Sequence, residues 1–231
     1  MVQKEMIHAG HRQRLRQRFL AEGLDSFNEI NALELLLFYC VPRKDTNELA
    51  HKLIDYFGSY AAVLNASFND LKKVNGVSDS IATYLCLQRE AARYYLVSDM
   101  ARGTVVENTE DYAKIMLPYF VGRSNETVYL LCLDAKCKVL CCREISTGSV
   151  NAASISMRKL MDVAISSNAT MAILAHNHPG GVAVPSAEDI ATTRQVEKAL
   201  SSIDVHLVDH LVIAANDYVS IRQSGYFLSS R

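Results

Sequence analysis

The sequence has little net charge and no long apolar run, and both absences narrow the function classes that it can serve. Its 231 residues carry a formal net charge of −1, so no global field favours nucleic acid or a membrane surface. Its longest apolar runs, 32–40 and 127–133, are far shorter than the roughly 20 residues that cross a bilayer. We therefore expect no membrane partner.

The sequence also lacks a secretory signal and paired cysteine motifs. Residues 1–5 do not begin the apolar segment of a secretory leader, which makes cytoplasm the expected location. Of the six cysteines, three lie inside apolar stretches and three are spaced C-x3-C-C over 137–142. That spacing is not the C-x2-C pair of structural zinc sites. We expect the cysteines to have structural or incidental roles.

The sequence has the composition of a folded globular protein, 49% hydrophobic and 21% charged. Its residue patterns differ between a first and a second part. The first part predicts helices at 12–21, 32–39, 47–57, 59–65, 68–74 and 80–96. The second part predicts strands at 127–133, 138–145, 171–174, 205–213 and 218–222 and helices at 156–166 and 186–200. We predict an α+β protein: an all-helical domain, 1–102, followed by a mixed α/β domain, 103–231.

Two features of the helical part relate to nucleic acid. Four arginines at i, i+4 spacing would form two basic ridges that can contact phosphates, although such a run is commonly only a solvated face. These residues are Arg12, Arg14, Arg16 and Arg18. The stretch 71–82 resembles a helix-hairpin-helix element, in which a glycine-bearing turn presents backbone N–H groups to a phosphate. Gly76 is the first glycine of that turn, but Ser78 replaces the second, so a packing turn is the alternative.

The segment 175–189 contains a candidate metal site. His176 and His178 follow an apolar strand, and residues two apart on an extended chain face the same side. A Pro-Gly-Gly turn follows, and Asp189 lies in the first turn of the next predicted helix. Two imidazoles and one carboxylate leave the fourth position of tetrahedral Zn²⁺ open for water. We predict one Zn²⁺ per chain, although iron and manganese also suit these ligands.

Ser186 and Asp189 have a second interpretation. Their spacing approximates a capping box, and we do not expect one carboxylate to cap a helix and bind a metal together. H-x-H, seven residues, Ser, two residues and Asp is nevertheless the JAMM motif of JAB1/MPN metallopeptidases. The motif H-N-H-P-x-G, followed by P-S-x-x-D, resembles the RadC-like branch of that family. Residues 10–16, 42–46 and 207–213 resemble the same branch. The resemblance implies a JAB1/MPN, cytidine-deaminase-like fold for the second domain.

The resemblance also implies catalytic residues. Glu126, at the entrance of a predicted strand, corresponds to the family's general base and proton shuttle. Glu144 is the alternative because it too precedes a glycine turn. Ser186 would donate a hydrogen bond to the oxyanion, and Asn177 is expected to hold backbone. His210, with its neighbour Asp209, is either a support of the ligands or part of the core.

We therefore predict a zinc-dependent hydrolase of the JAMM type that cleaves a peptide or isopeptide amide in a peptide or protein substrate. The alternative is a DNA repair or recombination accessory protein that contacts DNA through its helical domain, with a structural or vestigial metal site. H-E-x-x-H and the H-x-E with C-x2-C of zinc deaminases are both absent. The substrate and the oligomeric state are not specified by any motif.

Overall fold

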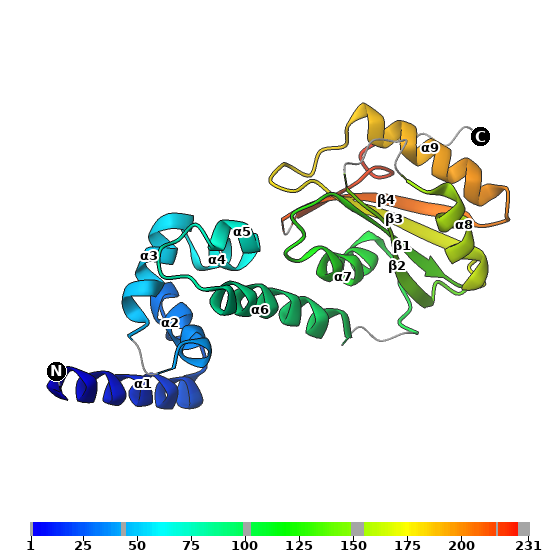
Figure 1. The fold of residues 1–231 in the computed structure, drawn as a ribbon. Coiled ribbons are helices and arrows are strands. Elements are labelled where there is room, and N and C mark those ends of the chain that lie inside the picture. Colours follow the sequence, from blue (N-terminus) through cyan, green and yellow to red (C-terminus); the bar gives the residue numbers. More distant parts are fainter. Residues whose placement is uncertain (1, 43–44, 99–102, 149–154, 216, 226–231) are drawn as a thin grey trace. The chain divides into compact units, whose positions relative to one another are not determined.

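The computed structural model of the chain describes residues 2–42, 45–98, 103–148, 155–215 and 217–225 (Figure 1). It divides into two compact units, Met1–Ala92 and Arg93–Arg231. The predicted boundary at 102/103 adjoins residues 99–102, which lie outside the described part, and it stays a prediction. No helix among the described residues has the length and apolar character needed to cross a membrane.

The first unit consists of helices of 4 to 21 residues around one larger and one smaller apolar cluster. In chain order they are α1 (Val2–Glu22), α2 (Glu29–Cys40), α3 (Asn47–Phe57), α4 (Tyr60–Asn65), α5 (Phe68–Leu71) and α6 (Asp79–Ser98), which continues past the end of the unit. Asn28, Ser59 and Ser67 each accept the backbone N–H three residues further on, which satisfies orphan donors of α2, α4 and α5. The core includes the fully buried Leu33 and Leu53.

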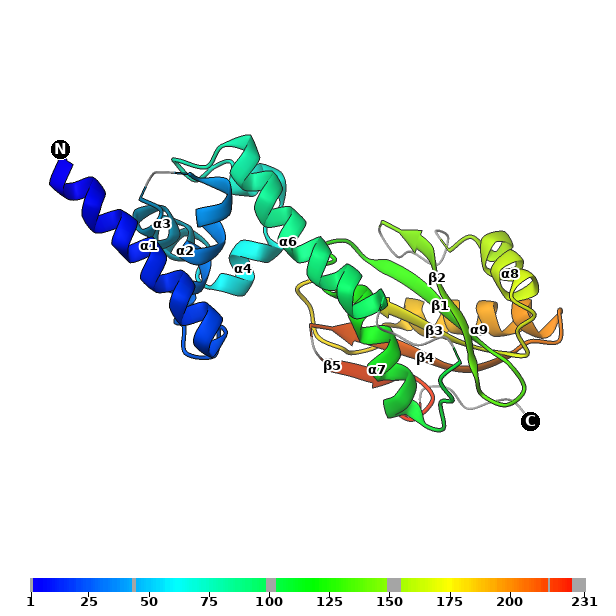
Figure 2. The same cartoon turned by 90° about the horizontal axis from the view of Figure 1, so that it is seen from below.

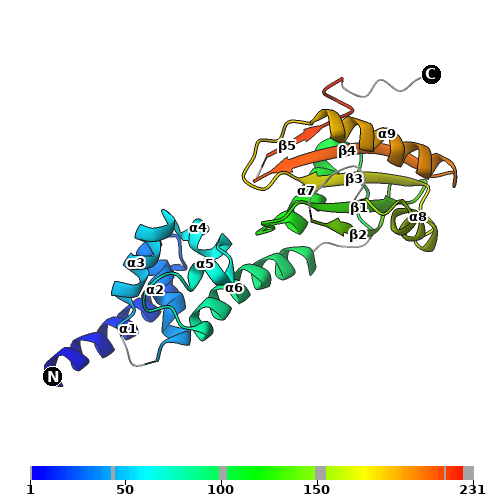
Figure 3. The ribbon, with the colours of Figure 1, turned by 45° about the horizontal axis from the view of Figure 1, so that its top comes forward.

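The second unit is built on a five-stranded mixed sheet. Its strands are β1 (Thr127–Leu133), β2 (Val139–Thr147), β3 (Met171–Asn177), β4 (His206–Ala214) and β5 (Asp217–Ser220). Figure 3 shows their order, β2-β1-β3-β4-β5. Only β3 and β4 run parallel, and the other neighbours are antiparallel. The predicted fold class, helices first and a mixed α/β domain second, is confirmed.

Helices cover both faces of this sheet. Helices α8 (Met157–Ser166) and α9 (Ala187–Ser201) pack on one face, and α7 (Thr109–Phe120) packs on the other (Figures 1 and 2). Alternate strand residues therefore enter two separate cores. On β3, Leu174 faces α8 and α9, whereas Ala175 faces α7. His176 follows this alternation and belongs to the α9 side.

Several local features differ from the sequence prediction. Helix α1 begins at Val2 rather than at residue 12, and α5 ends at Leu71 rather than at residue 74. Helix α7 was not predicted because Pro118 stands in its last turn, where it removes one backbone donor without ending the helix. Its start has an ordinary signal, since Asn108 accepts the N–H of Asp111. Strand β3 continues to Asn177 rather than ending at residue 174, because its last residues still pair with neighbouring strands: Val128 of β1 lies opposite His176. The histidines are thus held by the sheet.

Candidate metal centre

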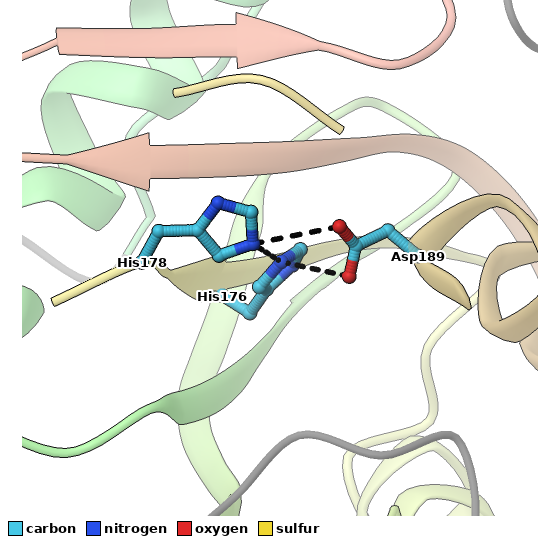
Figure 4. Close-up of side chains that lie close together, drawn as sticks. All are labelled: His176, His178 and Asp189. Carbon is cyan, nitrogen blue, oxygen red and sulfur yellow. Dashed lines mark hydrogen bonds and ion pairs between the residues drawn. The ribbon is translucent and has the colours of Figure 1, made fainter. Parts of the chain in front are cut away.

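Three side chains from the end of β3 and the start of α9 converge on one point (Figure 4). Nε2 of His176 lies 3.0 Å from Nε2 of His178 and 3.1 Å from Oδ1 of Asp189. His178 Nε2 lies 3.4 Å from the other carboxylate oxygen of Asp189, Oδ2. The side chains of His176 and Asp189 are 1% and 6% exposed, whereas that of His178 is 23% exposed. The group therefore opens to solvent on the His178 side.

The spacing of these donor atoms fits a small metal ion. Tetrahedral zinc with bonds of 2.0–2.1 Å holds neighbouring ligand atoms about 3.3 Å apart. The two contacts of His176 Nε2, 3.0 and 3.1 Å, are close to that value. His178 Nε2 lies 3.4 Å from the second oxygen of Asp189, Oδ2. Two imidazoles and a carboxylate are also the donor set that Zn²⁺ and related transition metals accept. The chain thus contains a His-His-Asp group that can hold a metal ion, as predicted.

The turn after β3 orients His178. Its Nδ1 lies 3.2 Å from the backbone carbonyl oxygen of Val182, and a carbonyl only accepts hydrogen bonds, so Nδ1 carries the proton. In the neutral ring the Nε2 lone pair is then available to a metal. The carbonyl can reach back because the chain reverses after Pro179, where Gly180 has a φ of +70° that favours glycine.

The carboxylate of Asp189 caps helix α9 and also faces the two histidines. Oδ2 accepts hydrogen bonds from the backbone N–H and the Oγ–H of Ser186, each with a donor–acceptor distance of 2.7 Å. In return, Ser186 Oγ accepts the Asp189 N–H. This is a complete capping box. Oδ1 meanwhile lies beside His176. The capping oxygen Oδ2 also lies 3.4 Å from His178 Nε2. The same carboxylate therefore caps α9 and faces both histidines, while the expectation that it does not cap and bind a metal together stays a prediction.

The charge state of Asp189 follows from the same contacts. Burial raises the pKa of its carboxyl, but His176 and the hydrogen bonds from Ser186 outweigh burial and hold that pKa well below its usual range. Asp189 is therefore an anion near neutral pH. The Ser186 hydroxyl gives its only proton to this anion, so in this structure Ser186 supports Asp189 directly.

A buried histidine contacts the back of His176. His210 Nε2 lies 2.7 Å from His176 Nδ1, and His210 Nδ1 lies 2.6 Å from Oγ1 of Thr193. Burial, followed by the nearby His176, holds the pKa of His210 well below its ordinary value. His210 therefore supports a proposed ligand, one of the two interpretations that the sequence left open. Thr193 was missed, although it follows Asp189 by four residues on the same helix face.

Asp209 points to the opposite side of β4 from His210. Its buried carboxylate accepts hydrogen bonds from Tyr112 OH, at 2.7 Å, and from Ser220 Oγ, at 2.6 Å. It also accepts the backbone N–H of His210 over 2.7 Å. These contacts join α7 and β5 to β4. Asp209 is thus a structural residue of the sheet and does not face the metal centre.

Asn177 holds the backbone on both sides of Glu126. Its Oδ1 accepts a hydrogen bond from the Thr127 N–H, with an N–O distance of 2.8 Å. Its Nδ2 donates to the Asn125 carbonyl oxygen, with an N–O distance of 3.2 Å. The prediction that Asn177 fixes backbone is confirmed. Glu126 directly precedes β1, two residues before Val128, which pairs with His176 in antiparallel register. Glu126 is half-buried and does not belong to the His-His-Asp group itself.

Glu144, the alternative base, is engaged elsewhere. Its carboxylate contacts Arg123 Nη2 at 3.0 Å and accepts from Tyr129 OH over 3.2 Å and Thr147 Oγ1 over 2.8 Å. Burial raises its pKa, but the hydroxyl of Thr147 and the charge of Arg123 outweigh burial and lower the pKa below its ordinary value. A carboxylate stabilised as an anion in this way is a weak proton acceptor. These contacts argue against Glu144 as the general base, and the role of Glu126 stays a prediction.

The arginines proposed for nucleic acid are mostly engaged within the helical unit. Arg14 is exposed. The other three lie over aromatic rings, with these distances to the ring centres: Arg12 to Phe38, 4.6 Å; Arg16 to Tyr39, 5.7 Å; Arg18 to Phe27, 4.6 Å. Arg12 also donates to the carbonyl of Val41 over 2.7 Å. These contacts give the basic ridges a packing role, and contact with DNA stays a prediction.

The glycine turn between α5 and α6 has the features of a packing turn. Gly76 has a φ of +100°, and a Cβ there would lie 3.3 Å from Leu49 Cδ1, so only glycine fits without strain. Val77 is buried in the helical core, and Ser78 Oγ accepts the N–H of Ile81 over 3.3 Å. These contacts account for the turn, and a phosphate contact at Gly76 stays a prediction.

Comparison with known proteins identifies the domain that carries the site. A family described as RadC-like JAB domain matches residues 106–226. That segment contains His176, His178 and Asp189 and makes up more than half of the chain. The chain belongs to the RadC-like JAB domain family. The family resemblance drawn from the motif spacing is confirmed.

The likeness to members of the RadC-like family extends beyond the JAB domain. The chain is 32% identical over 228 residues to a UPF0758 protein of Fusobacterium nucleatum subsp. nucleatum, an alignment that covers 96% of this chain and 98% of that protein. It is 34% identical over 211 residues to a UPF0758 protein of Bordetella bronchiseptica, covering 91% and 94%. The first alignment includes nearly the whole helical unit. These descriptions name a family and no reaction.

Proposed function

We propose that this protein is a zinc-dependent hydrolase of the JAMM metallopeptidase type that cleaves a peptide or isopeptide amide. The observation that carries the proposal is the convergence of three possible donor atoms, one each from His176, His178 and Asp189, which lie within 4.8 Å of one another. The fixed proton on His178 Nδ1 supports it, because that proton leaves the inward nitrogen as a lone-pair donor. A peptide or protein is the proposed partner.

In this proposal His176, His178 and Asp189 hold the ion, and the open side at His178 admits water and substrate. The chemistry that zinc supplies in such a donor set is Lewis acidity, which lowers the pKa of water to about 7. Glu126 takes a proton from the attacking water as the oxygen bonds to the amide carbon. The C–N bond then breaks, and Glu126 delivers that proton to the leaving amine nitrogen.

The support for Glu126 is positional. Asn177 fixes the peptide groups on either side of it, so its carboxylate starts from a restrained backbone beside the end of β3. Ser186 is proposed first as the residue that orients Asp189. Donation from its hydroxyl to an oxyanion would require Ser186 to break the hydrogen bond that it now donates to Asp189 Oδ2.

The test combines metal content with amide cleavage. Purified wild type and His178→Ala are compared by metal analysis after exposure to zinc, and wild type should retain about one ion per chain while the variant retains much less. Quenched-fluorescent peptides and lysine isopeptides then report turnover. Glu126→Gln should bind zinc as wild type does and lose turnover, whereas the matched Glu144→Gln should keep both. Equal turnover of wild type and Glu126→Gln would remove Glu126 from the mechanism, and metal-independent turnover would contradict the proposal.

The DNA-associated alternative has narrower support. Of the four arginines that motivated it, three lie over aromatic rings of the helical unit, and Arg14 is the one for which the described residues show no such ring. Binding to DNA would have to fall steeply with salt and survive His176→Ala. A fluorescence anisotropy titration with duplex DNA at two salt concentrations distinguishes this alternative from the hydrolase.

A further inference from the structure

A closed set of buried hydrogen bonds joins two of the three proposed ligands. It begins at Nδ1 of His176 on β3, passes through both ring nitrogens of His210 on β4, and continues to Oγ1 of Thr193 on α9. Thr193 Oγ1 in turn donates to the backbone carbonyl of Asp189 over 2.6 Å. His176, His210, Thr193 and Asp189 are between 1% and 4% exposed. We call this set the His176–Thr193 relay.

The end at Thr193 determines one proton. A carbonyl oxygen only accepts, so the Thr193 hydroxyl donates to Asp189. A hydroxyl has one proton, so Thr193 Oγ1 must accept in its second hydrogen bond, the 2.6 Å contact with His210 Nδ1. The proton of that hydrogen bond comes from His210 Nδ1. His210 therefore carries a proton on Nδ1.

The end at the metal determines the other proton. If His176 Nε2 is a metal ligand, its lone pair is in use, and the proton of the neutral ring lies on Nδ1. Nδ1 then donates to His210 Nε2 over 2.7 Å, which requires a lone pair on that nitrogen. Both ends of the relay thus call for the same form of His210, protonated on Nδ1 and accepting on Nε2. Every ring nitrogen in the relay is then satisfied.

Water cannot take the place of these partners. Both imidazole rings and the Thr193 side chain are almost fully buried, so solvent does not reach them. A ring nitrogen that loses its partner here is therefore left buried without a hydrogen bond, which is costly. The relay has a single satisfied arrangement of protons when a metal is bound.

The relay opposes a tendency of the ligand set itself. Asp189 Oδ1 lies 3.1 Å from His176 Nε2, and an anion at this distance favours a proton on the nitrogen that has to bind the metal. We propose that His210 and Thr193 are positioning residues that keep the proton of His176 on Nδ1 and so keep Nε2 available to the metal. The proposal rests on the proposed metal site, and it concerns how that site is prepared.

Thr193→Val and Thr193→Ser form a matched pair for the test. Valine keeps the shape and removes the hydroxyl, whereas serine keeps the hydroxyl. In Thr193→Val nothing holds the His210 proton on Nδ1, so the Asp189 anion draws the His176 proton to Nε2 and His210 donates to His176 Nδ1 from its own Nε2. Zinc binding should therefore weaken about 10–100-fold, the range for lost partners of metal ligands, while Thr193→Ser keeps wild-type affinity. Competition with a chromogenic chelator measures the affinity of the full chain.

Nuclear magnetic resonance of histidine-labelled protein supplies the second readout, independent of activity. In wild type, with and without zinc, the His210 proton should be found on Nδ1, and in metal-free Thr193→Val on Nε2. His210→Gln, whose amide oxygen can accept from His176, should retain more zinc affinity than His210→Leu. Thermal unfolding shows whether Thr193→Val folds. If it does not, the zinc affinities of His210→Gln and His210→Leu test the relay instead.

The outcomes separate the relay from the hydrolase proposal. Equal zinc affinity in wild type and Thr193→Val would overturn the relay. Equal losses in Thr193→Val and Thr193→Ser would also overturn it, because the effect would then be packing. A His210 proton on Nε2 in the wild type would do the same. Wild type that binds no zinc but carries the proton on Nδ1 would contradict the proposed function and support the relay.

Discussion

Replacing Asn177 with alanine should loosen the backbone that carries Glu126 without removing any proposed metal ligand. The amide of Asn177 makes two hydrogen bonds, to Thr127 N over 2.8 Å and to the carbonyl of Asn125 over 3.2 Å. Asn177 is 5% exposed and Thr127 is 0% exposed, so water does not replace the lost amide. A buried group that loses its partner costs about 1–3 kcal/mol. We expect the free energy of unfolding of the second unit to fall by about that amount.

The assay pairs denaturant unfolding with hydrogen exchange of peptides that contain Thr127. Its amide proton should exchange faster in Asn177→Ala, zinc affinity should stay unchanged, and turnover should fall because the position of Glu126 is no longer restrained. Asn125→Ala is the matched control: it keeps the backbone carbonyl and should change stability by less than about 0.5 kcal/mol. An Asn177→Ala protein with wild-type stability and wild-type protection at Thr127 would refute the reasoning.

Three further predictions follow from other contacts of the chain. Ser186→Ala should lower the free energy of unfolding by about 1 kcal/mol through loss of the cap and weaken zinc binding; an unchanged denaturation curve would contradict the capping role. Glu144→Gln should cost about 0.2–1 kcal/mol, as for partly exposed ion pairs. Because the folded pKa of Glu144 is lowered, this difference should be present above its unfolded pKa of about 4.3. It should vanish as pH falls through the folded value, and urea titrations at several pH values that show no such trend would argue against the pair with Arg123. Arg12→Ala should destabilise the helical unit in thermal unfolding, because Arg12 packs on a ring and caps a carbonyl. Arg14→Ala should leave the unfolding temperature unchanged, and the opposite order would contradict this assignment.

Much of the proposed site could be predicted because its signals are local. The spacing of His176 and His178 places both rings on one face of an extended chain, and Ser186 with Asp189 marks the start of α9. The helix predicted at 47–57 has the same bounds as α3, since its end carries a local signal, Gly58 with a φ of +92°. Each of these inferences needs only the covalent geometry of a few neighbouring residues.

The rest depended on contacts between distant parts of the chain. His210 lies behind His176 because β4 pairs with β3 in a register that sets His210 opposite Leu174, and register is a property of the assembled sheet. That Asp189 caps α9 and also faces both histidines needs the position of α9 against β3. Likewise the family resemblance ranked Glu126 before Glu144, but only the fold places an arginine beside Glu144 and brings the backbone around Glu126 to Asn177. Local pattern therefore determined which residues can bind a metal, whereas tertiary packing decided which protons and partners surround them, because burial and long-range pairing have no signal in a short stretch of chain.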